Sequence, residues 1–514
     1  MPQVDPPRPP CDDIVVTVAG VQKLLNNLNP AKASGPDGIS PRILKELAVE
    51  LAPALSVLFQ ASIDTGVIPA DWRTAIVAPI FKKGERYKPE NYRPISLTSI
   101  PCKLLEHIVV GHVMDYCDQH NILCNEQHGF RSKHSCESQL IGFIDEVSED
   151  LERGHQIDLL VMDFSKAFDK VSHSLLVNKL RHYGITGSTN NWIAGFLAGR
   201  QQAVVVNGVT SSYVPVESGV PQGSVLGPSL FLLYINDLPS DLAATARLFA
   251  DDTACHQTVY TEADQESLQS DLDKMAVWEE KWKMEFHPQK CSTVHITKSN
   301  TSSKKDYKLR GHTLEEEDSV KYLGVTISSD LKWNKHVSNI CNKANKTLGF
   351  LRRTLRINNK KVKKMAYQAL VRPVLEYSSS VWDPPTSDLA DALESVQRRA
   401  ARWVCNRYRR TSSVDDMLEE LQWPTLAARR TEARLINFYK FHHSLININS
   451  KFAPQPSKAR KSRRLYHQLS YDVPSCRTDY RKKSFFPRTI PQWNSLPSSA
   501  VSASTVDAFK TCIK

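Results

Sequence analysis

Three aspartates beside short apolar runs are the residues of this chain best suited to do chemistry. Asp163 directly follows the apolar run 157–162, and Asp251-Asp252 stand between two strand-like runs. Carboxylate oxygens are the ligands that Mg²⁺ prefers, and two such ions together can activate a hydroxyl and stabilise charge on a phosphorus atom. Buried carboxylates also need a cation. From these residues alone, the Asp251-Asp252 pair is either a metal site or a polar turn.

Two further Asp-Asp pairs show that this dipeptide by itself carries little information. Asp12-Asp13 and Asp415-Asp416 are interpreted as solvated or helix-capping acids. The apolar residues before Asp251 and the strand-like residues after Asp252 separate that pair from the other two.

Strands and tight turns are the elements that must hold the acids in place. The apolar residues 75–81 predict one strand, and 157–162 predict another. Asn207-Gly208 is a favoured two-residue turn and predicts a hairpin of 204–206 with 213–216. The other predicted elements are a hairpin of 247–250 and 253–259 with both acids at its turn, helices over 164–180 and 268–282, and strands at 294–297 and 322–327.

Both ends of the chain are predicted to be mainly helical. Residues 14–62 carry two helical runs, split by turn residues at 34–38. Beyond about residue 330, paired basic residues recur on predicted helices, where they either follow a nucleic-acid backbone or form a solvated surface. Residues 454–464 indicate a flexible basic linker. The paired bases are Arg352-Arg353, Lys360-Lys361, Lys363-Lys364, Arg398-Arg399 and Arg429-Arg430.

The composition indicates a large soluble intracellular protein with a basic surface. The chain has 514 residues, of which 41% are hydrophobic, and a net charge of +11 that suits either a polyanionic partner or solubility. Its 11 cysteines include no C-x-x-C pair and predict reduced thiols. No run approaches the roughly 20 apolar residues of a membrane span, and residues 1–10 do not form a signal peptide.

Seven motifs in a fixed order carry a family resemblance. Over about residues 30–330 the chain resembles the reverse transcriptases of non-LTR retrotransposons, most closely the jockey and CR1-like groups, and RPVLEY at 372–377 is similar too. The motifs are PIFKKG at 79–84, NYRPISL at 91–97, QHGFR at 127–131, DFSKAFD at 163–169, GVPQGS at 219–224, FADD at 249–252 and YLGV at 322–325.

The resemblance implies an RNA-directed DNA polymerase that works by nucleotidyl transfer with two Mg²⁺ ions, for which Mn²⁺ can substitute. Asp163 and Asp251 match the metal-binding aspartates of the family, with Asp252 as a third, weaker ligand. Asp169, a helical turn and a half past Asp163, is expected not to touch the metal. Lys290 matches a lysine that protonates the leaving pyrophosphate, and an ordinary surface lysine is the alternative.

The resemblance also assigns residues to the incoming nucleotide. Lys82 or Lys83, together with Arg93, match finger residues that hold the triphosphate, although two lysines before a glycine also suit a solvated turn. Phe168 matches an aromatic gate that excludes the 2′-hydroxyl of ribonucleotides by steric overlap. The alternative for Phe168 is a core phenylalanine on a helix face.

Two further segments are assigned to the template and the primer. Gln222 and Gly223 match the loop-to-helix corner that lies against the template and the new base pair, where glycine permits close backbone approach. Tyr322, Leu323 and Gly324 match the primer grip, or they belong to an ordinary core strand.

The fold that the resemblance implies is α/β, a right-hand polymerase with fingers, a palm holding an antiparallel sheet, and a helical thumb, plus a mainly helical basic C-terminal region. Fingers are expected at 14–155 and part of 175–215, and the palm at 156–174 and 216–330. The predicted domains are a disordered leader at 1–12, a helical extension of the fingers at 13–62, fingers and palm at 63–330, a helical basic thumb at 331–450, and a basic linker and tail at 451–514.

The chain also departs from the family pattern. An endonuclease domain usually precedes the polymerase in this family, but only about thirty residues precede the region of resemblance, so no nicking activity is expected here. No acidic constellation of the ribonuclease H kind and no Cys/His knuckle follows residue 330. We therefore interpret the chain as the polymerase part of a longer product or as a truncated copy.

The implied partners are an RNA template, a DNA primer or target DNA, and dNTPs, without a membrane. The resemblance implies work on nuclear DNA, while no motif indicates an oligomeric state. A non-catalytic nucleic-acid-binding remnant is the rival interpretation, although decay would be expected to remove the three acids. A polymerase of the group II intron maturase type is disfavoured because no maturase-like or zinc-binding tail is present.

Overall fold

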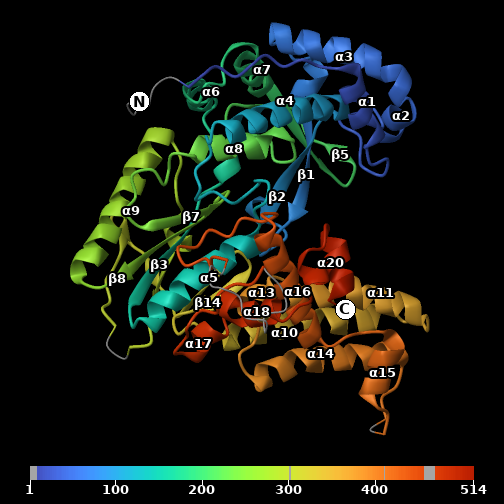
Figure 1. The fold of residues 1–514 in the computed structure, drawn as a ribbon. Coiled ribbons are helices and arrows are strands. Elements are labelled where there is room, and N and C mark those ends of the chain that lie inside the picture. Colours follow the sequence, from blue (N-terminus) through green and yellow to red (C-terminus); the bar gives the residue numbers. More distant parts are fainter. Residues whose placement is uncertain (1–7, 300–301, 410, 457–468, 514) are drawn as a thin grey trace. The chain divides into compact units, whose positions relative to one another are not determined.

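The computed structural model describes residues 8–299, 302–409, 411–456 and 469–513 (Figure 1). The chain forms two compact units, each built from segments that are distant in sequence. Unit 1 comprises Met1–Phe130, Asp163–Leu242 and Asp271–His287, and unit 2 comprises Arg131–Met162, Ala243–Ser270 and Pro288–Lys514. None of the helices in the described ranges is both long enough and apolar enough to cross a membrane.

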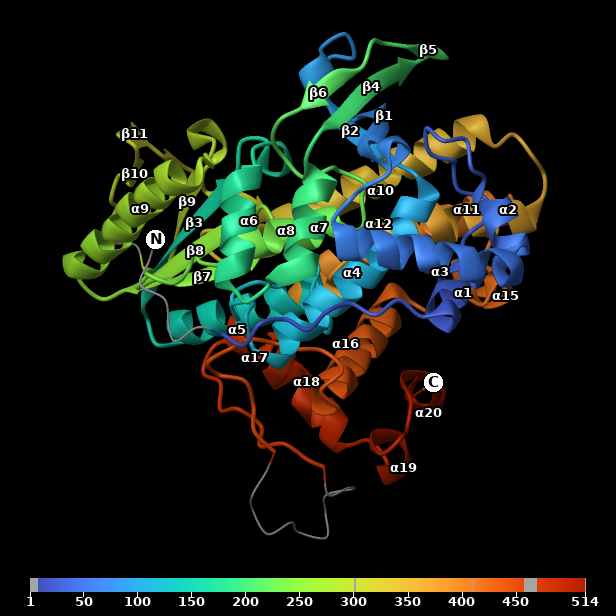
Figure 2. The same ribbon diagram turned by 90° about the horizontal axis from the view of Figure 1, so that it is seen from above.

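Unit 1 contains a mixed sheet with the strand order β2-β1-β4-β5, and β6 lies beside β4 (Figure 2). Strand β1 pairs antiparallel with β2 and parallel with β4. The predicted strand at 75–81 is confirmed as β1, whose first residues alternate between partial and full burial. The strands are β1 (Thr74–Phe81), β2 (Tyr92–Leu97), β4 (Arg200–Val206), β5 (Val209–Thr210) and β6 (Val214–Val216).

The Asn207-Gly208 turn is confirmed, but its predicted partner strand is wrong. Both residues have positive φ, 51° and 82°, and they join β4 directly to β5. A two-residue turn fixes the register, so Val206 pairs with Val209. Strand β6 pairs instead with the opposite end of β4, around Arg200.

The helices of unit 1 confirm the two N-terminal helical runs and correct a third. The predicted helix over 164–180 is broken: a short 3-10 turn comes first, and the α-helix starts only at His173. Lys166 has a φ of 53°, which no helix interior adopts. The helices are α1 (Val18–Asn26), α2 (Pro41–Glu46), α3 (Ala48–Thr65), α4 (Ile100–Gln119), α6 (His173–His182), α7 (Gly187–Leu197) and α8 (Leu226–Ile235), with 3-10 turns η1 (Ala70–Arg73), η2 (Pro89–Asn91) and η3 (Ala167–Asp169).

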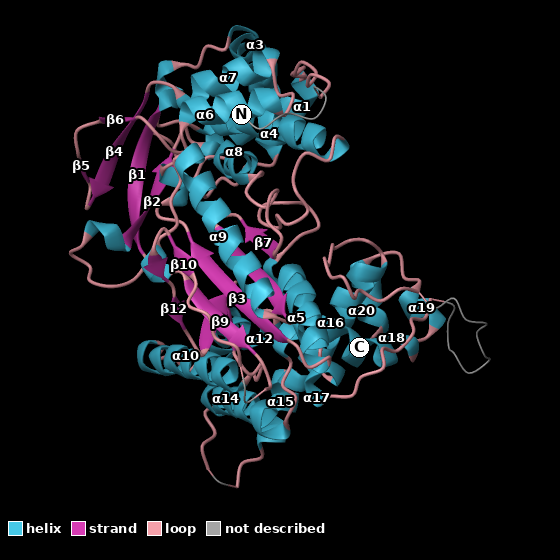
Figure 3. Ribbon diagram, turned by 90° about the vertical axis from the view of Figure 1, so that its left-hand side faces the viewer, coloured by secondary structure: helices cyan, strands magenta, loops and turns pink. Residues whose placement is uncertain are grey.

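Unit 2 contains a second sheet with the order β12-β9-β3-β8-β7 (Figure 3). β3 is buried along nearly its whole length, as a central strand should be. The pairs β3·β9 and β7·β8 are antiparallel, whereas the edge strand β12 is parallel to β9. The strands of this sheet are β3 (Gln156–Asp163), β7 (Thr245–Phe249), β8 (Asp252–Val259), β9 (Ser292–Ile296) and β12 (Glu315–Glu316). Two separate hairpins consist of β10 (Lys308–Leu309) with β11 (His312–Thr313), and of β13 (Ser319–Tyr322) with β14 (Val325–Ser328).

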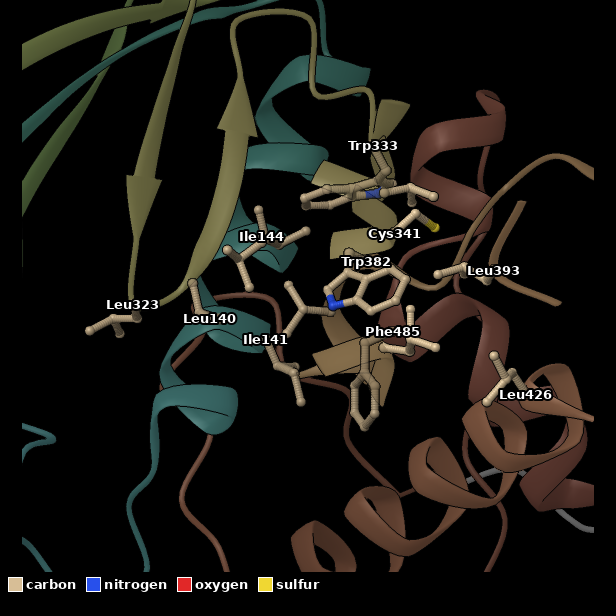
Figure 4. Packing of buried hydrophobic residues seen from close by; sticks show 14 of the residues in the cluster. Leu140, Ile141, Ile144, Leu323, Trp333, Cys341, Trp382, Leu393, Leu426 and Phe485 are labelled. Carbon is tan, nitrogen blue, oxygen red and sulfur yellow. The ribbon is translucent and has the colours of Figure 1, made fainter. Parts of the chain in front are cut away.

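One hydrophobic cluster joins this sheet to the helices of unit 2 (Figure 4). Leu140 and Ile144 of α5 share it with Trp333, Trp382 and Phe485, which come from the C-terminal half of the chain. The helices are α5 (Cys136–Glu152), α10 (Asn334–Thr354), α11 (Lys360–Leu370), α12 (Arg372–Glu376), α13 (Ser379–Trp382), α14 (Ser387–Cys405), α15 (Val414–Leu421) and α16 (Leu426–His442); α9 (Glu262–Trp282) runs through both units, and η4 (Pro288–Lys290) is a 3-10 turn.

The region predicted as a basic linker and tail is largely folded. Residues 469–513 form α17 (Asp479–Lys482), α18 (Phe485–Asn494), α19 (Ser498–Val501) and α20 (Val506–Cys512). Trp493 and Phe509 are fully buried in the same cluster as α5. Short helices rich in proline and serine give a weak periodic signal, which explains why the sequence analysis named no elements in this tail. Most of the predicted linker at 454–464, from residue 457 on, lies outside the described residues.

Candidate active site

Asp163 lies at the end of a strand whose backbone contacts the segment at Phe286 and His287. It is the last residue of β3, and its backbone carbonyl accepts a hydrogen bond from the His287 N–H at 2.8 Å. The next residue, Phe164, stacks on Phe286 with ring centroids 4.0 Å apart. These contacts fix the backbone that carries the Asp163 carboxylate.

Asp251 and Asp252 are divided between the turn and the second strand of the β7–β8 hairpin. Phe249 pairs with Asp252, so Ala250 and Asp251 form the two-residue turn. Ala250 is buried with a φ of 55°, a left-handed conformation that is uncommon for alanine. The prediction that both acids lie at the turn is therefore wrong for Asp252, because Ala250 takes the first turn position.

The strands that carry these acids are neighbours in one sheet. β3 ends at Asp163, β8 begins at Asp252, and the sheet order places β3 next to β8. Carboxylate oxygens on strand ends suit a hard divalent cation. Within the described ranges, however, no three or more His, Cys, Asp or Glu side chains are arranged to hold a metal ion. The donor chemistry of these three carboxylates nevertheless fits a divalent metal ion.

Lys82, Lys83 and Arg93 are exposed and lie on the β1–β2 hairpin. The Lys82 N–H donates to the Asn91 carbonyl at 2.9 Å, which extends the pairing beyond β1, and Arg93 lies opposite Ile80 in β2. None of the ion pairs found among the described residues involves these three cations. The hairpin therefore offers several positive charges to an anion.

The loop before α8 is pressed against β2, as the assignment of Gln222 and Gly223 requires. The Ser96 N–H donates to the Gln222 carbonyl at 2.7 Å, and the Gln222 Nε2 donates to Asp169 Oδ1 at 3.0 Å. A Cβ on Gly223 would lie 2.7 Å from the Ser96 carbonyl oxygen, and the Gly223 φ is 113°. Only glycine fits there. Asp169, which was expected not to touch the metal, accepts a hydrogen bond from Gln222 of this loop.

Glu106 is a residue of this site that the sequence analysis missed. It lies on α4, is fully buried, and its Oε2 accepts the N–H groups of Val225 and Leu226 at 2.7 and 3.0 Å. Burial raises the pKa of its carboxyl group, against the two backbone donors. The carboxylate thus caps the N-terminus of α8, the helix that follows the loop with Gln222 and Gly223. A lone carboxylate within the apolar run of 100–113 was the available signal.

Phe168 is half-buried and lies in the η3 turn, not at the start of a helix as predicted. Its ring stacks on the buried Phe231 of α8 with centroids 4.5 Å apart and planes 19° apart. Its carbonyl accepts the Val220 N–H at 2.8 Å. One ring face is therefore fixed by packing while part of the side chain stays accessible.

The segment at 322–325 is a hairpin turn, so the predicted continuous strand over 322–327 is wrong. Leu323 and Gly324 have φ values of 43° and 85° and join β13 to β14. The Tyr377 hydroxyl donates to the Leu323 carbonyl at 3.0 Å, and a Cβ on Gly324 would lie 2.8 Å from the Tyr377 ring. Tyr322 is only 1% exposed, and burial raises its pKa. The primer-grip role stays a prediction.

Lys290 is exposed and ends the short η4 turn before β9. Its role stays a prediction.

The paired bases beyond residue 330 do not form one uniform surface. Lys363 is buried beside Trp403, and Lys364 donates to the Leu421 carbonyl at 2.7 Å. Arg430 is buried and binds Asp383 at 2.7 Å. Arg352 and Arg353, by contrast, are exposed. Neither a contact with a nucleic-acid backbone nor a solvated surface therefore describes every pair, because sequence spacing does not reveal which basic side chain packs inward.

Comparison with known proteins shows what this part of the chain is similar to. Residues 80–327 match the family model described as reverse transcriptase, an RNA-dependent DNA polymerase. That range includes all three aspartates, the β7–β8 hairpin and the loop before α8.

Curated relatives extend the similarity beyond that range. The RNA-directed DNA polymerase from mobile element jockey of Drosophila melanogaster is 27% identical over 415 residues, which is 78% of this chain and 45% of that protein. The probable RNA-directed DNA polymerases from transposons BS and X-element of the same fly are 26% and 25% identical, over 84% and 92% of this chain and 49% and 52% of those proteins. The chain thus spans about half the length of these relatives.

Proposed function

The chain carries a reverse transcriptase domain at residues 80–327, and from this premise we propose that it is an RNA-directed DNA polymerase of the non-LTR retrotransposon kind. The observation that carries the proposal is the position of the acids within that domain. Asp163 ends β3, and Asp251-Asp252 occupy the turn and start of β8, the neighbouring strand. Reverse transcriptases use divalent metal ions, and these carboxylates supply the oxygen ligands that such ions prefer.

Asp163, Asp251 and Asp252 would hold two Mg²⁺ ions, or Mn²⁺ in their place. Bound there, the ions would activate the primer 3′-hydroxyl and stabilise charge on the phosphorus. The contribution of the chain is a rigid backbone beneath the acids: the Asp163 carbonyl is bound by the His287 N–H, and Ala250 holds the turn in a left-handed conformation. Rigid carriers matter because catalysis depends on ligands that do not reorganise.

The exposed cations of the β1–β2 hairpin would bind the triphosphate of the incoming dNTP. Arg93 can donate two parallel hydrogen bonds to phosphate oxygens, while Lys82 and Lys83 act as point charges. Lys290 is assigned the protonation of the leaving pyrophosphate. An ammonium group near a developing negative charge lowers the barrier to its departure.

Phe168 would select deoxyribonucleotides, and Gln222 with Gly223 would support the template and the new base pair. The support for the gate is the stacking of Phe168 on Phe231, which keeps the ring from moving aside for a 2′-hydroxyl. The support for the template role is the close approach of the Gly223 backbone to Ser96, which sets the loop in one position.

The proposed partners are an RNA template, a DNA primer or target DNA, and dNTPs. Exposed cations such as Arg352 and Arg353 would contact the nucleic-acid backbone, and the β13–β14 hairpin would contact the primer. Work on chromosomal DNA would take place in the nucleus.

Primer extension by the purified full chain on homopolymer RNA and DNA templates tests the proposal. Extension with Mg²⁺ or Mn²⁺ on RNA, lost in Asp163→Asn and Asp251→Asn, is the expected result. Nucleic-acid binding without extension under either ion would instead support the non-catalytic remnant.

A further inference from the structure

The segment after α16, residues 446–451, lies against α5 at a position where only a glycine fits. The Asn447 N–H donates to the Lys133 carbonyl at 2.8 Å, and the Ser450 hydroxyl donates to Asp145 Oδ2 at 2.6 Å. A Cβ on Gly142 of α5 would lie 2.2 Å from the Asn449 carbonyl oxygen, closer than any real contact. The backbone of the segment therefore packs directly against α5 at Gly142.

The same segment is joined to β7 through a buried ion pair. Arg247 of β7 donates from Nη2 to Glu146 Oε2 at 2.7 Å and from Nη1 to the Asn449 carbonyl at 3.3 Å. The other oxygen of Glu146 accepts the Lys451 N–H at 2.9 Å. Arg247 and Glu146 are each only 3% exposed, and breaking one side of such a pair leaves a buried charge without its partner.

Arg247 stands four residues before Asp251, on the strand that leads into the acid-bearing turn. The Tyr322 hydroxyl lies 3.5 Å from the Arg247 carbonyl, and the Arg247 Nε lies 3.4 Å from His256 Nε2 on β8. Burial, and then the charge of Arg247, holds the pKa of His256 well below its usual range, so the neutral ring can accept that hydrogen bond. Arg247, which is itself on β7, thus also contacts β8, the other strand of the hairpin.

We propose that residues 446–451 are a positioning element for Asp251 and Asp252, acting through Glu146 and Arg247 on the base of the β7–β8 hairpin. The inference rests on the proposed function, which makes these two aspartates metal ligands. It assigns a role in polymerisation to a segment outside the matched domain. A small displacement of a ligand carrier is enough to matter, since a misplacement of about 1 Å can cost on the order of a hundredfold in rate.

A pair of variants at one position isolates the backbone contact. Lys451→Pro removes the N–H that binds Glu146, whereas Lys451→Ala keeps it. Both variants lose the exposed hydrogen bond from Lys451 Nζ to Thr245 Oγ1 of β7, so the difference between them isolates the N–H. For Lys451→Pro we expect kcat to fall by about tenfold or more, with the Kd for primer–template within about twofold and a higher Mg²⁺ concentration at half-maximal rate. Lys451→Ala should stay near wild type in all three measurements.

Hydrogen–deuterium exchange without metal or substrate gives a second measurement that does not need activity. Exchange over residues 245–259 should rise in Lys451→Pro and not in Lys451→Ala, because the hairpin base loses its anchor. A second pair covers the case in which Lys451→Pro does not fold: Gly142→Ala forces the segment off α5, whereas Gly111→Ala adds a methyl in open space on another helix.

The outcomes separate the two proposals. A wild-type chain that extends no primer refutes the proposed function, and the exchange measurement then still decides the positioning role. An active wild type whose Lys451→Pro and Gly142→Ala variants match their controls in kcat, Mg²⁺ dependence and exchange refutes the positioning role alone.

Discussion

Two hairpins of unit 2 have the same kind of turn and opposite surroundings. Both β7–β8 and β13–β14 close with two residues, and each turn begins with a non-glycine residue at positive φ, Ala250 at 55° and Leu323 at 43°. The first hairpin carries Asp251 half-buried and Asp252 exposed, whereas the second buries Tyr322 and Leu323. The geometry of the turn therefore does not tell which hairpin carries exposed acids and which one is part of the core. Burial and polar partners do.

The difference predicts which quantity each hairpin controls. Substitutions at the acids should change rate and leave the free energy of unfolding nearly unaltered, because those side chains are not packed in the core. Substitutions in β13–β14 should lower the free energy of unfolding first, because Tyr322 is buried and a Cβ on Gly324 would meet the Tyr377 ring.

The largest expected effect is at the acid hairpin. Asp251→Asn, like Asp163→Asn, should abolish primer extension while RNA binding and thermal stability stay near wild type. Removing one charge from a two-metal site costs several kcal/mol of transition-state stabilisation, at least about a thousandfold in rate. Single-turnover extension with Mg²⁺ measures it, and Asp415→Asn on α15 is the control. A variant that keeps about a tenth of the wild-type rate would contradict the metal assignment.

Phe168 is packed like the residues of β13–β14 and also partly accessible like the acids of β7–β8. One face of its ring stacks on Phe231, and the side chain is half-buried overall. Phe168→Val should admit ribonucleotides while largely sparing deoxynucleotide incorporation, because the shorter side chain no longer overlaps the 2′-hydroxyl. The ratio of kcat/KM for dNTP over NTP should fall by orders of magnitude. An equal loss of rate with both substrates would show instead that Phe168 is only a core residue stacked on Phe231.

A substitution in the β13–β14 hairpin should lower the free energy of unfolding. Gly324→Ala combines a φ of 85° with a Cβ 2.8 Å from the Tyr377 ring, whereas Gly311→Ala at the β10–β11 turn has a φ of 77° and open space. Both variants share the backbone strain, so the difference isolates the clash. We expect Gly324→Ala to lose about 1–3 kcal/mol more than Gly311→Ala in the free energy of unfolding, measured with urea. Equal losses would mean that Tyr377 moves aside freely.

The smallest expected effect concerns the exposed bases of α10. Changing Arg352 and Arg353 to Gln should flatten the salt dependence of RNA binding by about one to two phosphate contacts. The same change at Lys363 and Lys364 should leave the slope unaltered, because those side chains are held by Trp403 and by the Leu421 carbonyl. A slope that responds equally in both variants would remove the distinction between exposed and packed bases.

Several elements followed from the sequence because short-range patterns determine them. The apolar runs at β1 and β3, the helical spacing within α9 and the Asn207-Gly208 turn were all predicted correctly, since each depends on residues within a few positions of one another. The ordered motifs also indicated the family whose model matches residues 80–327.

Other features were decided only by tertiary structure. The sequence did not reveal that Glu106 caps α8, that Gln222 binds Asp169, or that residues 446–451 lie on α5. Each depends on a partner more than fifty positions away, and a hydrogen bond or a buried charge has no periodic signature in the chain. For the same reason Lys363 and Arg353 look alike in sequence, although one packs against Trp403 and the other faces solvent.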